Sequence, residues 1–146
     1  MTLEAYFCTV FMRSMNWKLI LGLALSGPIL ALAGNYGLIG FSTEPYFALG
    51  LVILFAIIFS LAKTGKYFLH GFTTTLLFGV LMTLTRLKFL QQYINANPDA
   101  MDKGENVLHQ FHFTRSPMII MACLILISAI IAGVFASAAH LIFRRN

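Results

Sequence analysis

The sequence predicts an all-α fold, an integral membrane bundle of four transmembrane helices with an N-terminal amphipathic segment. Hydrophobic residues make up 59% of the 146 residues and charged residues only 10%, whereas soluble domains contain about a quarter charged residues. The apolar residues also fall into four long runs separated by short polar stretches. A soluble protein this small needs a largely polar exterior, because small domains have much surface for their volume. We therefore expect lipid to cover this one.

Residues 1–14 are predicted to form the amphipathic segment, and residues 15–146 the transmembrane domain. Leu3, Phe7 and Val10 recur at helical spacing in the first segment, with polar residues between them. This pattern is typical of helices that lie in the membrane interface. The alternative is that the segment is an N-terminal extension of the first span.

The first span is predicted at about residues 17–40, which is long enough for the roughly 20 apolar residues that cross a hydrocarbon core. Trp17 and Lys18 form an interfacial anchor at its start. Pro28 has no N–H group and its ring clashes with the preceding turn. We therefore expect a kink near the middle of this helix.

The second span is predicted at about residues 46–62, and no polar side chain precedes Ser60 in it. The short turn before it carries Glu44 and no Lys or Arg, and the basic turn Lys63-Thr-Gly-Lys66 follows it. With Glu44 in a turn, no acidic residue lies inside a predicted span. This absence argues against a proton-driven transporter.

The third span is predicted at about residues 67–96, as one long helix. It is apolar to about Leu84, and apolar residues continue at helical spacing beyond that point. We expect its last turns, which include Arg86, to stand out of the bilayer. The helix should end at Asn97-Pro98, because the residue before proline avoids the α region.

A polar loop over residues 97–116 leads into the fourth span, predicted at about residues 117–143, where Pro117 suits a first helical turn. Six Lys and Arg residues lie on the side of the two termini, and four on the side of this loop. Cytoplasmic loops are enriched in Lys and Arg. We therefore expect a bacterial inner-membrane protein with both termini in the cytoplasm and the loop 97–116 on the opposite side.

Small residues at four-residue spacing predict how the helices pack. Lipid tails are as apolar as leucine, so helix association in a membrane depends on close backbone approach and on interhelical hydrogen bonds. We expect the third and fourth spans to pack through their small faces. These faces comprise Thr75, Gly79 and Thr83 on the third span and Ala129, Ala132, Gly133, Ala136 and Ser137 on the fourth. The alternative is that small residues are simply common in membrane helices.

Two histidines are candidates for a cofactor site. His70 follows Lys66 by four residues, and His140 precedes Arg144 by four residues, so both should lie about one turn inside the same membrane face. Two histidines at matched depth could hold a haem iron between them, or serve a quinone or a proton path. The alternative is two polar side chains near the interface, hydrogen-bonded to neighbours. We expect no cofactor, with haem b as the alternative.

A second candidate site is a metal site in the polar loop. Glu105, His109 and His112 have the spacing i, i+4, i+7 and would share one face of a helix. Sets of Glu and His of this kind bind zinc or iron. The pattern is loose, however, and we favour the alternative of a solvated polar face on a short surface helix.

Three further features lie along the last two spans. They are the turn Lys63-Thr-Gly-Lys66-Tyr-Phe leading into Phe72-Thr-Thr-Thr, a third helix that runs out into Tyr93-Ile-Asn-Ala-Asn-Pro98-Asp99, and a final apolar helix that ends in Ile142-Phe-Arg-Arg145. In these features the chain resembles a domain-of-unknown-function family of small bacterial inner-membrane proteins with four helices. The resemblance covers most of the chain after residue 15 and implies the same membrane fold. It implies no reaction and no ligand.

The sequence therefore predicts a non-enzymatic membrane subunit, an accessory or structural component of a larger membrane complex or of a homo-oligomer, which associates through the small-residue faces. It contains no glycine-rich phosphate loop and no nucleophile elbow. The expected partners are the lipid bilayer and other membrane subunits or a second copy, and no nucleic acid. Two alternatives remain open: a redox subunit that binds haem or quinone through His70 and His140, and a small oligomeric transporter.

Overall fold

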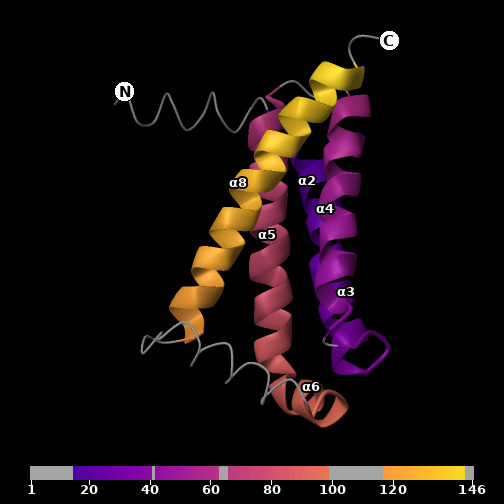
Figure 1. Ribbon diagram of the computed structural model, residues 1–146, viewed down its shortest axis with the longest axis vertical. Helices are drawn as coiled ribbons and strands as arrows, with labels where there is room; N and C mark the ends of the chain where they lie inside the picture. Colours follow the sequence, from indigo (N-terminus) through magenta and orange to yellow (C-terminus); the bar gives the residue numbers. More distant parts are fainter. Residues whose placement is uncertain (1–14, 41, 63–65, 99–116, 144–146) are drawn as a thin grey trace.

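The computed structural model describes residues 15–40, 42–62, 66–98 and 117–143, and their regular structure is helical (Figure 1). Within the last range, side chains are described for residues 122–142. The helices are α2 (Trp17–Ala24), α3 (Ser26–Asn35), α4 (Glu44–Leu61), α5 (Tyr67–Lys88), α6 (Leu90–Ala96) and α8 (Pro117–Phe143). The amphipathic helix predicted for residues 1–14 lies outside the described residues.

Four helical stretches are long and apolar enough to cross a membrane, as the sequence predicts. They are Trp17–Asn35, Glu44–Leu61, Tyr67–Lys88 and Ala122–Ile142. In Figure 1, α4, α5 and α8 run along the long axis of the molecule, with α2 and α3 behind them. The protein is an all-α integral membrane protein.

The first span consists of two consecutive helices, α2 and α3, which meet at Leu25. Pro28 follows the meeting point by three residues. Because it has no N–H group, it cannot donate to the carbonyl of Ala24 as a residue inside a regular helix would. The interruption therefore falls in the part of the span where the sequence predicts a kink.

The helical part of the first span ends at Asn35, five residues before the predicted end at residue 40. Gly37 has a φ of 70°, which is the left-handed conformation that commonly closes a helix. The N–H of Leu38 donates back to the carbonyl of Ala33 at 2.9 Å. These are the features of a glycine cap, which stops the helix before the apolar run ends.

The third span differs from the prediction of one long helix, because α5 and α6 are separated at Phe89. The backbone of Phe89 has φ −114° and ψ 28°, outside the helical range. Figure 1 shows α6 turning away from the axis of α5. The side-chain amide of Asn97 donates to the carbonyl of Gly34 at 3.1 Å, which fixes the end of α6 against α3. The predicted continuous helix over residues 67–96 is therefore wrong at Phe89, where a tertiary contact outweighs the local periodicity.

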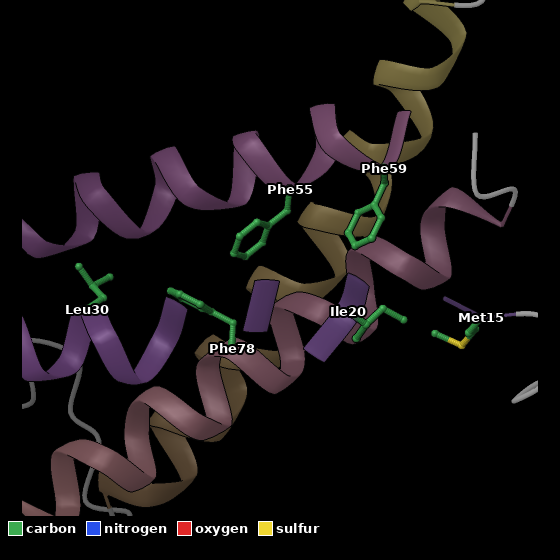
Figure 2. Close-up of a cluster of buried hydrophobic side chains, with 6 residues drawn as sticks. All are labelled: Met15, Ile20, Leu30, Phe55, Phe59 and Phe78. Atoms are coloured by element: carbon green, nitrogen blue, oxygen red, sulfur yellow. The ribbon is translucent and has the colours of Figure 1, made fainter. Parts of the chain in front are cut away.

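Large apolar side chains fill the space between the first three spans, as Figure 2 shows. Phe55 of α4 meets Phe78 of α5 edge to face, with ring centroids 5.8 Å apart and an angle of 74° between the rings. Such aromatic pairs contribute beyond the area they bury. The buried members of this cluster are Met15, Ile20, Leu30, Phe55, Phe59 and Phe78. None of the described side chains of α8 belongs to it.

The helix α8 packs instead through small residues, and its largest contact is with α5. A Cβ atom added to Gly71 of α5 would lie 2.8 Å from the carbonyl oxygen of Ala132, and one added to Gly133 would lie 2.9 Å from that of Phe68. The two glycines therefore let the backbones of α5 and α8 come close. The buried alanines of α8 are Ala129, Ala132 and Ala136.

We predict that Gly71→Ala destabilises the bundle. The atom that the new methyl group would meet belongs to the α8 backbone, which cannot rotate away, so we expect a loss of about 1–3 kcal/mol. Thermal unfolding in detergent would measure it. Gly22→Ala in α2 is the matched control, because a Cβ atom there has nothing within 4 Å. It should leave stability unchanged or raise it by up to about 1 kcal/mol. Equal melting temperatures for the two variants would contradict this account of the contact.

Candidate functional site

Glu44 and Arg86 form an ion pair at the end of the bundle where α6 lies. Glu44 is the first residue of α4 and is 4% exposed. Arg86 lies in the last turn of α5, and its Nη2 donates to Oε1 of Glu44. The expectation that Glu44 lies in a turn outside the helix is therefore wrong. The buried acid also removes the sequence argument against a proton-driven transporter, because that argument relied on the absence of such a group.

The backbone of α3 covers this ion pair. A Cβ atom added to Gly34 would lie 3.6 Å from Oε2 of Glu44 and 3.7 Å from Nη2 of Arg86, which is ordinary contact distance. Removing two charges from water costs several kcal/mol per ion, so a buried pair requires good geometry and further partners. The close approach at Gly34 shields the pair on one side and joins α3, α4 and α5 at this end.

Tyr93 of α6 covers the pair on another side. The guanidinium carbon of Arg86 lies 4.4 Å from the centre of the Tyr93 ring, within the range of a cation–π interaction. Burial raises the pKa of the Tyr93 hydroxyl above its ordinary value, and the positive charge of Arg86 lowers it in part. The hydroxyl is therefore protonated at neutral pH. It has no hydrogen-bond partner among the described residues, and neither has the buried amide of Asn35.

A cleft of about 360 Å³ lies beside the ion pair, between α4, α5 and α8. The residues that the sequence assigns to the packing face of the third span lie in its wall. Thr75 is buried and its hydroxyl has no partner among the described residues, and a Cβ atom on Gly79 would meet the side chain of Ile125. The wall includes Ala48 and Val52 of α4, Thr75, Gly79, Thr83 and Arg86 of α5, and Ile125 and Ser128 of α8.

His70 is fully buried, and both of its ring nitrogens have partners. Its Nε2 accepts from the backbone N–H of Asn16 at 3.2 Å, and its Nδ1 lies 3.2 Å from the carbonyl oxygen of Lys66. These contacts assign the tautomer with the proton on Nδ1, which donates to Lys66. The ring thus ties the start of the first span to α5. Ligation of a metal through Nε2 would first require the loss of the Asn16 hydrogen bond.

His140 lies at the same end of the bundle but has a different partner. Its ring stacks on that of Tyr67, with centroids 3.8 Å apart and an angle of 15°. Tyr67 precedes His70 by one turn of α5, so the two histidines lie near the same level. Each is engaged by its own neighbour, and no described contact joins them. The haem or quinone site predicted for this pair remains an expectation.

The metal site predicted for Glu105, His109 and His112 lies outside the described residues. Among the residues that are described, no three His, Cys, Asp or Glu side chains group closely enough to hold a metal ion.

A shallow groove on the outward face of α4 is a feature that the sequence analysis missed. It has a volume of about 340 Å³ and is lined by Tyr46 and by four bounding residues along the helix, Phe47, Gly50, Leu51 and Leu54. A Cβ atom added to Gly50 would have nothing within 4 Å. The four bounding residues have the spacing i, i+3, i+4, i+7, the arrangement that forms a hole for a side chain of a facing helix. The sequence does indicate this groove, because a single glycine, Gly50, lies among three large apolar residues at that spacing.

Comparison of the chain with known protein families, with curated proteins and with solved structures finds no match. The resemblance to a family of small inner-membrane proteins is therefore not supported by these comparisons.

We predict that the ion pair contributes to stability only as a pair. Arg86→Met leaves the Glu44 carboxylate buried without its partner and should cost about 3 kcal/mol, near the lower end for buried pairs because Arg86 is partly exposed. The double variant Glu44→Met/Arg86→Met should recover most of this loss, because two apolar groups can replace a buried pair. Unfolding in a detergent titration of the wild type, of Glu44→Met and Arg86→Met, and of the double variant would measure these losses. Additive losses in the double variant would contradict the coupling.

Proposed function

We propose that this chain is a non-enzymatic integral membrane subunit that assembles with another membrane protein, or with a second copy of itself, through the outward face of α4. The observation that supports this proposal most directly is the hole around Gly50. It lies on a helix whose outward side chains are large and apolar, including Phe47 at 55% exposed and Leu54 at 48% exposed. In lipid, such a hole brings a facing helix close enough for van der Waals packing.

The small-residue faces are less suitable for a partner than the sequence alone indicates. Ala129, Ala132 and Ala136 are each at most 2% exposed and are covered by other helices of the same chain. Gly133 lies against Phe68. An external helix cannot reach these atoms without separating α8 from α5. Association through the small residues of α8 is therefore replaced in this proposal by association through α4.

The proposed location is a bacterial inner membrane with both termini in the cytoplasm. Lys18, at the start of α2, and Lys66, at the start of α5, belong to the end that the excess of Lys and Arg assigns to the cytoplasm. The Glu44–Arg86 pair would then lie toward the periplasmic side. Fusion of a reporter that is active only in the periplasm, placed after residue 98, tests this orientation.

A simple measurement distinguishes the redox alternative from the proposed assembly. A haem held by His70 and His140 gives the purified protein a strong Soret absorbance, and a bound quinone can be extracted and detected. The transporter alternative requires flux in liposomes. The proposed assembly through α4 makes no use of these histidines, so these measurements do not bear on it.

We predict that Gly50→Leu prevents assembly while leaving the subunit folded. The leucine side chain fills the hole that a partner helix would enter, and we expect the population of the complex to fall about tenfold, equivalent to about 1.4 kcal/mol. Native mass spectrometry from mild detergent would give the stoichiometry of the wild type and of the variant. Gly22→Leu is the matched control, because that position is also open but lies on α2. A wild type that is extracted from its membrane with neither a second copy nor another membrane protein bound, or a complex that tolerates Gly50→Leu, would refute the proposal.

A further inference from the structure

The two hydrogen bonds of His70 join the ring to different parts of the chain. Nδ1 donates to the carbonyl of Lys66 on its own helix, whereas Nε2 accepts from the backbone N–H of Asn16, 54 positions away in sequence. The ring has no exposed surface, and Phe59 of α4 lies against it with ring centroids 5.4 Å apart. The lone pair on Nε2 is therefore the polar link between this ring and the start of the first span.

A proton on Nε2 would remove one of these contacts and keep the other. Both nitrogens of an imidazolium ring are donors. Nδ1 would still donate to Lys66, whose left-handed backbone, with a φ of 42°, precedes the first turn of α5. Nε2, however, would carry an N–H that faces the N–H of Asn16, and two donors without an acceptor are unfavourable. Protonation of His70 thus acts on the Asn16 contact alone.

The charged groups around His70 do not favour a second positive charge at this end of the bundle. Lys66 contacts the ring through its carbonyl, and the one carboxylate among the described residues is that of Glu44, at the opposite end. A charge that is buried without a partner is unfavourable. The titratable residues described at this end are Lys18 of α2, Lys66 and Tyr67 at the start of α5, and His140 of α8.

Asn16 lies between two residues that pack on the apolar cluster. Met15 is 6% exposed and belongs to the cluster, and Trp17 packs against it. The N–H of Trp17 donates to the carbonyl of Met15 at 3.0 Å, so residues 15–17 form one connected turn. Loss of the Asn16 contact removes the hydrogen bond that ties this turn to α5, and water then has access to the tryptophan.

We propose that His70 is a pH-sensitive switch that holds residues 15–17 against α5 while its ring is neutral and releases them when Nε2 takes up a proton. The contact is present at neutral and higher pH and is lost as the pH falls. The switch lies at the opposite end of the bundle from the Glu44–Arg86 pair and does not depend on assembly through α4.

Fluorescence tests the release directly, because Trp17 is the only tryptophan in the chain. The protein in detergent is titrated from about pH 8 to about pH 5, the range in which histidine changes its charge. We expect quenching by acrylamide, a neutral quencher, to rise about twofold as the turn opens locally. Quenching that stays constant over this range overturns the proposal.

Two variants assign the transition to one ring. In His70→Gln the side-chain carbonyl can accept from Asn16 and the amide can donate to Lys66, but the group does not titrate. Its quenching should stay low throughout. His140→Gln is the matched control, because it removes the other described histidine at this end, and it should keep the transition. A transition that persists in His70→Gln, or that His140→Gln also abolishes, overturns the assignment.

Nuclear magnetic resonance of the wild type decides the question if His70→Gln does not fold. With labelled histidine, the His70 ring should carry its proton on Nδ1 at about pH 8 and gain a second proton as the pH falls to about 5. The amide resonance of Asn16 should shift in step with that second proton. A ring protonated on Nε2 at the higher pH, or an Asn16 amide that does not shift, overturns the proposal.

Discussion

Close backbone contact between α5 and α8 is the constraint on which the bundle depends. In lipid, a leucine gains little by moving from a hydrocarbon tail to another helix, so packing distance rather than apolar area decides whether a helix stays attached. Among the described side chains, the fourth span buries only small residues, whereas the other three spans also bury phenylalanine, leucine or isoleucine. Gly71 and Gly133 allow the backbones to approach, and every larger residue at either position would separate them.

The two ends of the bundle are closed by different polar interactions. At one end the His70 ring joins α5 to the residue before α2, through a hydrogen bond to the Asn16 N–H. At the other end the Glu44–Arg86 pair joins α4 to α5, and Asn97 joins α6 to α3. Each of these interactions links segments far apart in sequence. Polar groups near the membrane boundary thus join the first three spans and α6, while α8 is held by close packing against α5.

The four spans and the interruption near Pro28 could be predicted because their signals are local: an apolar run of sufficient length, and a residue without an N–H group. The end of the first span was misplaced because the positive φ of Gly37 outweighs the apolar residues that follow it. The helix predicted to continue past Phe89 fails for another reason, since the Asn97–Gly34 contact is tertiary. The Glu44–Arg86 pair joins residues 42 positions apart, and no periodicity in either segment indicates it.

The small-residue stripes illustrate the difference between recognising a packing face and knowing what it packs against. On α8 the alanines are covered within the chain, so the stripe that most resembles an oligomer interface is already occupied. On α5, Ile125 of α8 packs against Gly79, and the cleft beside Thr75 and Thr83 is the space that the helices of this chain leave between α4, α5 and α8. The outward hole on α4 has one glycine and no stripe at all. In a small membrane protein, the helices of the chain bury their best packing faces against one another. The surface available to a partner protein is therefore the part of the helices that this internal packing leaves exposed.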